Sequence, residues 1–559
     1  MSAEGRDRLY LLLFTALLVG AGLGLRDPWP ADEPRFALVA RDMVATGDWL
    51  FPRVGGDLYP DKPPFYFWVI ASFYLITGSL RLAFLLPALV AALGVVALVH
   101  DMARRLFGRS AALLAAGTLA ASVQFVAVMR GAQIDPFLCL LTTFSLYALL
   151  RHLLLGPDWR WYFAGALVAG LGVITKGVGF LPILVLLPFA LLRARGFNAL
   201  PPIRGGWRWP VLGLGGLLLG IAVWLVPMVL AVAASGDPAL QAYRDEILFQ
   251  QTVTRYSAAW HHVEPWYYFF VNVIPGLWLP FSLLLLWLVP RWREAWRERN
   301  ARVWLPLGWL LVLLLFFSLS SGKRGVYVFP GLPALALAAA PFLPALYAKR
   351  AVRIASLLLA AVLVLITWAL AIGWQLNLAD LRATAAGYGV THPWPLYLLA
   401  AATLLAWLIC SGRAPLLGWP ATLLSCALVW ALALMPQFNG ERSSRDFMAG
   451  VIRLAGAQPL GLAAWKEQFL LYVPGKVTHF GHNRWQEGAQ EFYDAARWLN
   501  ETPEARLLVP AGSVAECFAM SPAQSAGRSS GSEWVLIAAP AASACAERGQ
   551  QRRFIYGPG

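Results

Sequence analysis

The sequence predicts an all-α polytopic membrane protein that ends in a small α/β domain, and three observations support this prediction. Of the 559 residues, 59% are hydrophobic and only 13% are charged, whereas soluble domains carry about 25% charged residues. Apolar runs of roughly the 20 residues that a membrane-spanning helix needs recur up to residue 435. The composition then becomes polar, so we expect a transmembrane domain at 1–436 and a C-terminal domain at 437–559.

The apolar runs are numerous enough for about thirteen membrane-spanning helices of the required length. The first run follows Arg6–Arg8 without a small-residue cleavage site, so we expect an uncleaved helix rather than a signal peptide. The predicted spans are 9–25, 82–101, 110–128, 135–154, 159–174, 177–193, 209–235, 267–290, 303–319, 327–346, 352–374, 393–411 and 415–435.

The links between these spans predict their orientation, because cytoplasmic loops collect Lys and Arg. Every second link is basic, which predicts a cytoplasmic N-terminus and places the C-terminal domain on the outer side. This alternation requires that the short apolar run Phe65–Gly78, which begins after Pro63 and Pro64, lies in the membrane interface. If it crossed the bilayer, every later loop would change sides. The basic links are 104–109, 151–160, 193–208, 291–302, 349–353 and 411–413.

The net charge of +15 belongs mainly to these short links, where it sets orientation, so nucleic-acid binding is excluded as a reading of the charge. The 26 Trp and 17 Tyr residues often flank apolar runs, as is typical of side chains at the membrane–water boundary.

The polar C-terminal region predicts a small α/β domain. Its pattern indicates helices near 443–454 and 486–500 and strands near 469–473, 506–510 and 534–538. Cys517 and Cys545 lie in this region and can form a disulfide if it faces an oxidising compartment. The five cysteines of the chain show no metal-binding spacing.

The first outer loop contains an amphipathic segment that begins at Asp32 and Glu33. Its apolar residues follow helical spacing, which predicts a helix lying on the membrane surface with the two carboxylates at its N-terminus. Asp is also among the best N-cap residues, so a purely structural role for Asp32 stays open. The apolar stripe consists of Phe36, Val39, Ala40, Met43 and Val44.

A second segment of the same loop places Asp61 and Lys62 beside the aromatic run Phe65–Trp68. Charged side chains at membrane depth are costly and tend to be functional. We therefore expect the chemistry of the chain to lie at the outer face.

The order of these loop motifs resembles a known family. D-E-x-R-[FY]-A at Asp32, G-D-W-[LV]-x-P at Gly47 and Y-x-[DE]-K-P-P-x-x-[YF]-W at Tyr59 are similar to the lipid A 4-amino-4-deoxy-L-arabinose transferases and related bacterial membrane glycosyltransferases of the GT-C fold. Later segments match in the same order, although the family often has Glu at the position of Asp61. These segments are Arg130–Pro136, Thr175–Gly177, His262–Tyr268 and Ser320–Pro330.

The resemblance implies a GT-C transmembrane domain and a polyprenyl-phosphate-sugar-dependent glycosyltransferase of the inverting type. The donor would be a sugar on undecaprenyl phosphate, and the acceptor an outer-leaflet glycolipid such as lipid A, with 4-amino-4-deoxy-L-arabinose as the sugar. The chain would then lie in the bacterial inner membrane among its lipids, with the C-terminal domain in the periplasm. A mannose or another hexose moved to protein or another glycan is the close alternative.

Sugar transfer from a polyprenyl phosphate requires a carboxylate for the acceptor proton and positive charge for the phosphate. The resemblance implies catalytic roles for Asp32 and Asp135, with Glu33 in support. It also implies a divalent metal, Zn or Mg/Mn, near Asp61 and His262. The residues expected to bind the lipid phosphate are Lys62, Lys323, Arg324, Tyr327, Tyr59 and Arg35.

Structural alternatives exist for several of these residues. Asp135 precedes Pro136 and fits an N-cap, and His262 can be an interfacial residue that binds nothing. For Lys176 we favour a lysine that extends to the interface without a catalytic role. A transporter of a lipid-linked sugar is the alternative from another class, but the charges gather at one face and no paired halves are evident.

Overall fold

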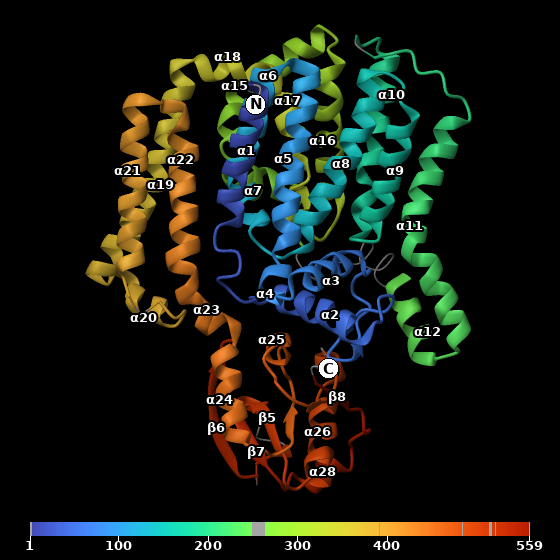
Figure 1. The fold of residues 1–559 in the computed structure, drawn as a ribbon, viewed down its shortest axis with the longest axis vertical. Helices are drawn as coiled ribbons and strands as arrows, with labels where there is room; N and C mark the ends of the chain where they lie inside the picture. Colours follow the sequence, from blue (N-terminus) through green and yellow to red (C-terminus); the bar gives the residue numbers. More distant parts are fainter. Residues whose placement is uncertain are drawn as a thin grey trace.

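The computed structural model describes residues 3–198, 200–248, 263–390, 392–482, 484–513, 517–519 and 521–557. Long helices run side by side in a bundle, and the C-terminal domain lies beyond one end of it (Figure 1). Short helices of the first loop lie across the bundle between these two parts (Figure 1). We call the bundle end next to the C-terminal domain the outer end.

Within the described residues, nine helical segments are long and apolar enough to cross a membrane. Five of them are single helices: α8 (Ile134–Leu155), α11 (Arg208–Ser235), α16 (Ala301–Leu319), α19 (Arg350–Leu376) and α21 (Trp394–Arg413). The other four are each made of consecutive shorter helices. Two of them have two parts: α4 (Leu80–Ala83) with α5 (Leu86–Phe107), and η1 (Gly177–Val185) with α10 (Leu186–Ala194). The third runs through α17 (Gly331–Ala339), η5 (Ala340–Phe342) and α18 (Leu343–Ala348), and the fourth through η7 (Pro415–Leu417), α22 (Gly418–Val429), η8 (Trp430–Leu434), α23 (Met435–Ser443) and α24 (Arg445–Ala455).

Two bent helix pairs raise this number to eleven if each pair is one span. The pair of α6 (Arg109–Ala120) and α7 (Val123–Met129) is bent by 60°. The second pair is bent by 107° and joins η3 (Phe269–Val273) and α14 (Ile274–Leu277) to α15 (Phe281–Arg297).

The structure thus supports nine to eleven spans in its described part rather than the expected thirteen. The two further predicted spans correspond to α1 (Ala3–Gly20) and α9 (Trp159–Val173), which both stand in the bundle (Figure 1). Charged side chains occupy the first two turns of α1, and α9 has only 15 residues. A span needs about 20 apolar residues, so neither helix reaches that length by itself.

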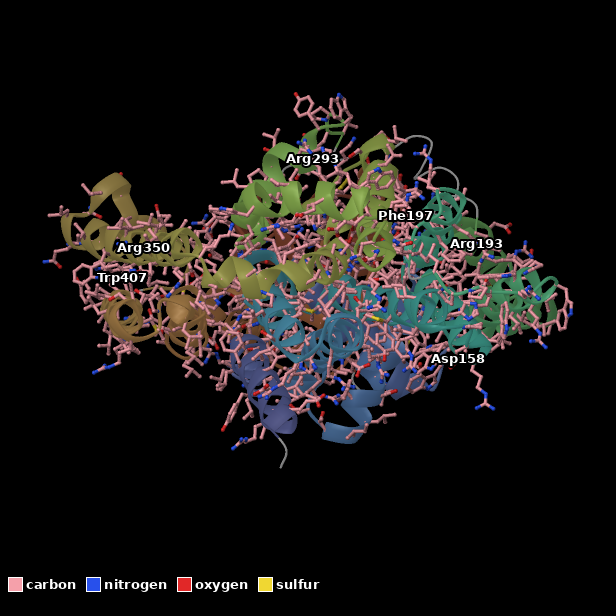
Figure 2. The ribbon with its side chains drawn as sticks, turned by 90° about the horizontal axis from the view of Figure 1, so that it is seen from above. Asp158, Arg193, Phe197, Arg293, Arg350 and Trp407 are labelled. Carbon is pink, nitrogen blue, oxygen red and sulfur yellow. A yellow bond between two sulfur atoms is a disulfide. The ribbon has the colours of Figure 1, made fainter. Side chains whose placement is uncertain are left out.

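The ends of the bundle differ as the basic links predict. Figure 2 looks down on the end away from the C-terminal domain and labels Arg193, Arg293 and Arg350 there. The C-terminal domain lies at the opposite end, together with the first loop (Figure 1). The basic links and the predicted chemistry are therefore separated by the length of the bundle.

The first loop folds into two crosswise helices, α2 (Glu33–Thr46) and α3 (Phe65–Thr77), joined by the short hairpin of β1 (Arg53–Val54) and β2 (Asp57–Leu58). Figure 1 shows α3 lying across the bundle, as predicted for the interfacial run. The apolar stripe of α2 is largely buried, with Phe36 packed against Tyr66 and Phe67 of α3. Packing against protein rather than lipid alone therefore holds α2 in place.

The C-terminal domain contains a mixed sheet in the order β6-β7-β5-β3-β4-β8. The central strands β3, β4 and β5 are parallel, and the outer pairings are antiparallel. The strands are β3 (Leu460–Leu462), β4 (Val477–His479), β5 (Arg506–Pro510), β6 (Ala523–Ser529), β7 (Ser532–Ala538) and β8 (Phe554–Tyr556).

Most predicted elements of this domain are present. The expected helices correspond to α24 and α26 (Gln490–Glu501), and two expected strands correspond to β5 and β7. The strand expected at 469–473 is wrong, because residues 467–470 form the short helix α25, which packs against α2. The remaining strands were not anticipated.

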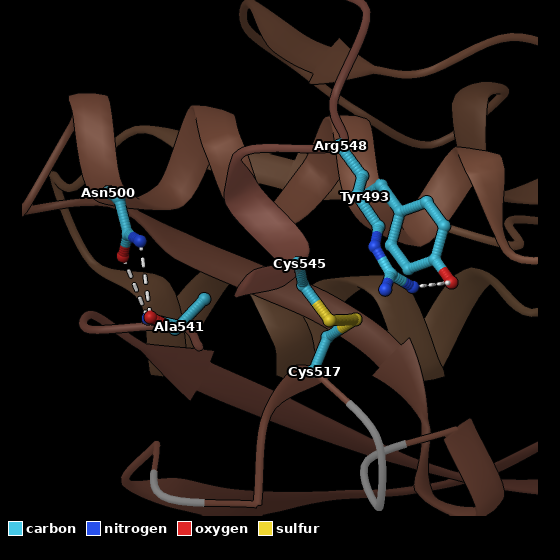
Figure 3. The surroundings of a disulfide bond; sticks show 6 residues. All are labelled: Tyr493, Asn500, Cys517, Ala541, Cys545 and Arg548. Atoms are coloured by element: carbon cyan, nitrogen blue, oxygen red, sulfur yellow. Dashed lines mark hydrogen bonds between the residues drawn. A yellow bond between two sulfur atoms is a disulfide. The ribbon is translucent and has the colours of Figure 1, made fainter. Parts of the chain in front are cut away.

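The possible disulfide is formed in the structure between Cys517 and Cys545, whose Cα atoms are 5.6 Å apart. Figure 3 shows it near two further contacts of the domain. The Asn500 side chain pairs with the backbone of Ala541, and Arg548 donates to the hydroxyl of Tyr493. The disulfide thus joins α28 (Ser543–Ala546) to the segment before β6.

A candidate active site at the outer end of the bundle

Asp32 stands at the N-cap position of α2, as the structural alternative predicts. Its backbone carbonyl accepts from the amide of Phe36, but among the described residues its carboxylate receives no capping hydrogen bond. The side chain is half-buried at the outer end. The carboxylate is therefore not held by the helix that it precedes, and it stays available for a proton or a ligand.

The neighbouring carboxylate of Glu33 is buried and joins three parts of the chain. It forms an ion pair with Arg26, whose second nitrogen lies 2.7 Å from Oε1. It also accepts from the backbone amides of Trp29 and Ala132, both at 2.9 Å. Because Ala132 belongs to the second outer loop, Glu33 fixes the first loop to the second. The supporting role in catalysis expected for Glu33 stays a prediction.

Asp135 lies in the first turn of α8, whose N-cap is Gln133 and not Asp135 as the structural alternative predicts. It forms an ion pair with Lys176, at 2.7 Å between Oδ1 and Nζ. The ammonium group of Lys176 also lies 5.1 Å from the centre of the Tyr327 ring. Three motifs that are far apart in the sequence therefore meet here.

A cavity opens beside these three residues. Its remaining walls come from apolar side chains of α8, η1, α16 and the loop after it, including Leu138, Leu181, Trp309, Leu313 and Phe317. The lining thus combines an ion pair and hydroxyl groups with hydrocarbon side chains, a combination that an amphiphilic ligand can contact.

Lys323 and Arg324 follow each other but have different surroundings. The Lys323 side chain is 4% exposed, and its ammonium donates to the carbonyls of Glu264 and Ser320 at 2.7 and 2.5 Å. Arg324 is exposed and forms no ion pair within the described residues. Lys323 thus holds its own loop together, and Arg324 is the more accessible cation.

The loop that carries these two cations is also held by Gln124 of α7. Buried Gln124 donates to the carbonyl of Gly325 at 2.8 Å and accepts from the indole of Trp278 at 2.7 Å. The backbone next to Tyr327 is therefore fixed to α7 and α14.

Arg35 and Tyr59 lie against the C-terminal domain. Arg35 forms an ion pair with Glu467 at 2.7 Å, and its guanidinium lies 5.8 Å from the centre of the Tyr59 ring. His482 contacts the same carboxylate at 3.0 Å. Burial acts to raise the pKa of Glu467, but the hydrogen bond to His482 and the charge of Arg35 outweigh it and lower this pKa to about 2. The charge of Arg35 is thus already matched by a carboxylate.

The proposed metal ligands are only partly described. Asp61 and Lys62 lie in the loop before α3, where each has further interactions, and His262 lies outside the described residues. Within the described part of the chain, His, Cys, Asp and Glu form no group of three or more that fits a metal ion. The metal at Asp61 and His262 stays a prediction.

The C-terminal domain holds the first loop at a further point. The buried carboxylate of Asp42 accepts from the hydroxyl of Tyr556 at 2.5 Å and from the amide of Gly55 at 3.0 Å. Arg41 donates to the same hydroxyl and to the carbonyl of Leu470, both at 2.7 Å. Burial raises the pKa of Asp42 to about 6. The first loop is therefore clamped between the bundle and the C-terminal domain.

Sequence reasoning missed three residues of this region. Lys176 was expected to be a simple interfacial lysine, but the structure pairs it with Asp135. Glu467 had no assigned role. The hydroxyl of Tyr66 is buried and has no partner among the described residues, and the Glu33 and Asp135 charges add to the effect of burial in raising its pKa. Of these three residues, only Lys176 lies in a family motif, Thr175–Gly177, which could have indicated a functional role.

Comparison with known proteins finds similar sequences and similar folds. Residues 61–233 match the sequence model of the family described as dolichyl-phosphate-mannose-protein mannosyltransferase. The crystal structure of ArnT from Cupriavidus metallidurans bound to undecaprenyl phosphate has a TM-score of 0.75 at 20% identity, covering 96% of this chain and 98% of that one. Its apo form has a TM-score of 0.72 at 21% identity.

Curated relatives are similar over part of the sequence. The undecaprenyl phosphate-alpha-4-amino-4-deoxy-L-arabinose arabinosyl transferase of Pseudomonas aeruginosa is 33% identical over 320 residues, which is 55% of this chain and 54% of that protein. A second enzyme of that name from Pseudomonas fluorescens is 29% identical over 73% of this chain and 68% of its own length. The chain thus spans little more than half the length of the first of these relatives.

The chain is a polytopic membrane protein with an ArnT-like fold. The chain is thus similar in sequence to the family that the loop motifs resemble, and similar in fold to a solved structure of ArnT.

Proposed function

We propose that the chain transfers a sugar from undecaprenyl phosphate to an outer-leaflet glycolipid, and that the sugar is 4-amino-4-deoxy-L-arabinose and the acceptor lipid A. The observation that supports this proposal best is the cavity at Asp135, Lys176 and Tyr327, whose lining combines an ion pair and hydroxyl groups with hydrocarbon side chains. A polyprenyl phosphate likewise combines an anionic head with an apolar tail. The relatives named for undecaprenyl phosphate substrates support the same donor.

In the proposed reaction, an oxygen of the acceptor attacks the anomeric carbon of the sugar. The bond between that carbon and the phosphate oxygen breaks, and undecaprenyl phosphate leaves with the bonding electrons. Asp32 takes the proton from the acceptor hydroxyl, since its carboxylate is not occupied by a capping bond among the described residues. The attack comes from the face opposite the phosphate, which inverts the configuration at that carbon.

Positive side chains stabilise the phosphate as its charge increases. We assign this role first to Lys176 and exposed Arg324, with Tyr327 as a hydrogen-bond donor and Lys62 as a further cation. Asp135 holds Lys176 in place through their ion pair. We assign Lys323, Arg35 and Tyr59 only an indirect role, because each already has a partner within the protein. Lys323 donates to backbone carbonyls, Arg35 is paired with Glu467, and the Tyr59 hydroxyl is hydrogen-bonded to Arg35.

The test is transfer in vitro from synthetic polyprenyl-phosphate sugars to a panel of acceptors. The full chain should transfer aminoarabinose to lipid A, and Asp32→Asn should lose transfer while its expression and unfolding temperature stay unchanged. Asp380→Asn is a matched control, because Asp380 is an exposed carboxylate of another loop. Full transfer by Asp32→Asn would refute the assignment of Asp32.

The same panel decides the alternative. The family match at residues 61–233 carries a mannosyltransferase description, which favours mannose transfer to protein as the second candidate. Product only with a mannosyl donor and a protein acceptor would replace the proposed function with this one.

A further inference from the structure

A second cavity lies at the outer end of the bundle, at the end of α1. Its wall is formed by α1, α5, α7, η8 and α23, which contribute the apolar side chains of Val19, Leu85, Leu89, Met129 and Met435. None of its lining residues belongs to the cavity at Asp135.

The polar part of this cavity is positively charged. Its lining contains Arg26 and Arg130 and no carboxylate. Glu33 neutralises Arg26, but Arg130 donates only to the carbonyls of Leu18 and Ala21 and has no acidic partner among the described residues. Burial and the charge of Arg26 lower the pKa of Arg130 to about 10, so it remains protonated at neutral pH. One half-buried positive charge is therefore left without an anion among the described residues.

Tryptophan and further arginine surround the cavity. Trp29 and Trp430 both line it, and the guanidinium groups of Arg26 and Arg442 lie 4.8 and 5.4 Å from the centre of a Trp29 ring. Arg442 is exposed and forms no ion pair within the described residues. Tryptophan is enriched at the level of lipid head groups. This side of the cavity thus has the character of the membrane interface.

We propose that this cavity is a binding site for a phosphate-bearing membrane lipid, with the phosphate near Arg130 and Arg442 and the start of an acyl chain along the apolar wall. Arginine binds phosphate through paired N–H donors. A cation that is largely withdrawn from water gains from an anionic partner, and a phosphate would supply one to half-buried Arg130. Basic pockets between transmembrane helices are known to hold anionic lipid heads. The site uses none of the residues assigned to sugar transfer.

The experiment is native mass spectrometry of the full chain in detergent with three separate probes. These are phosphatidic acid, diacylglycerol with the same acyl chains, and inorganic phosphate. The first bound phosphatidic acid should be held at least about fivefold more tightly than diacylglycerol, the effect expected from one arginine on an anionic head. Inorganic phosphate should not be retained, because it cannot use the apolar wall.

Variants assign that lipid to the cavity. Arg442→Gln and Trp430→Ala should each weaken the first phosphatidic acid by about fivefold. Arg413→Gln is the matched control, because Arg413 is an exposed arginine at the end of α21. Both test residues are at least partly exposed, so their substitution should leave the fold intact even if an Arg130 variant does not fold. Equal binding by the test and control variants, tight binding of diacylglycerol, or retention of inorganic phosphate would overturn the proposal.

Discussion

The contact of Glu467 with Arg35 and His482 leads to a quantitative prediction about how the C-terminal domain holds the first loop. The pKa of Glu467 falls from 4.5 to about 2 in the folded chain. A difference of one pKa unit corresponds to about 1.4 kcal/mol, so the ionised carboxylate contributes about 3 kcal/mol at neutral pH. Because the folded pKa is lowered, this contribution is complete above pH 4.5 and is lost as the pH falls from 4.5 towards 2.

Replacing Glu467 by Gln should therefore loosen the docking of α25 on α2. Hydrogen-exchange mass spectrometry on the full chain measures the opening of these helices. At pH 7, exchange of their slow amides should be roughly a hundredfold faster in Glu467→Gln than in the unaltered chain, which corresponds to about 3 kcal/mol. At pH 3 the difference in exchange rate between the variant and the unaltered chain should shrink to roughly tenfold, since most of the carboxylate contribution is gone.

The matched control is Glu504→Gln, which alters an exposed glutamate of the same domain. It should exchange like the unaltered chain at both pH values. Equal exchange in Glu467→Gln and in this control at pH 7 would refute the reasoning. A gap that does not narrow at pH 3 would show that the carboxylate charge is not its cause.

Three further predictions test other parts of the structure. Asp32→Asn should lower the rate of sugar transfer by about 10²- to 10⁴-fold, the usual contribution of a general base, in the in vitro assay with a saturating donor. Lys176→Gln leaves the carboxylate of Asp135 without its partner and should destabilise the chain by about 1–3 kcal/mol, with Lys176→Arg recovering part of both stability and transfer. Thermal unfolding in detergent measures this, and an unchanged unfolding temperature would contradict it. Replacing Cys517 and Cys545 by Ser opens a disulfide loop with a sequence separation of 28, which should cost about 3–4 kcal/mol; exchange of the β5 and β7 amides should rise, and unchanged protection there would contradict the estimate.

The helical part of the fold was predictable because lipid requires long apolar helices whose backbone groups are all paired. The number of membrane spans was less predictable than their helical structure. Charges at the start of α1 and the shortness of α9 are visible in the sequence, but whether such helices stand in the bundle depends on what they pack against. The crosswise position of α3 was predictable from the short run after Pro63 and Pro64, and the basic links gave the same answer independently.

Errors in the C-terminal domain have a simple physical cause. β3 and β4 have three residues each, too few to show an alternating pattern. The apolar run at Phe469 has strand-like composition, yet residues 467–470 turn into α25 because Phe469 and Leu470 are buried in the contact with the first loop. Tertiary packing decides such short segments, and it overrides their local preference.

The site was predictable as a set of residues but not as a set of contacts. Motif order placed Asp32, Asp135 and Tyr327 on one side of the membrane, and the structure brings the last two to one cavity. The partner of Asp135, however, lies 41 residues further along the chain. No spacing rule relates these two positions, because the turn at Lys176 is brought to α8 by the packing of α9 and η1.

The first loop owes its position to residues from three distant parts of the chain. Arg26 and the backbone of Ala132 hold Glu33, Glu467 holds Arg35, and Tyr556 holds Asp42. Asp32 lies within this stretch, and among the described residues its carboxylate receives no capping hydrogen bond. The position of its carboxylate therefore depends on contacts made by its neighbours, and two of the holding side chains belong to the C-terminal domain. A change at the far end of the chain should consequently alter transfer by moving Asp32 rather than by removing a group that touches the substrate.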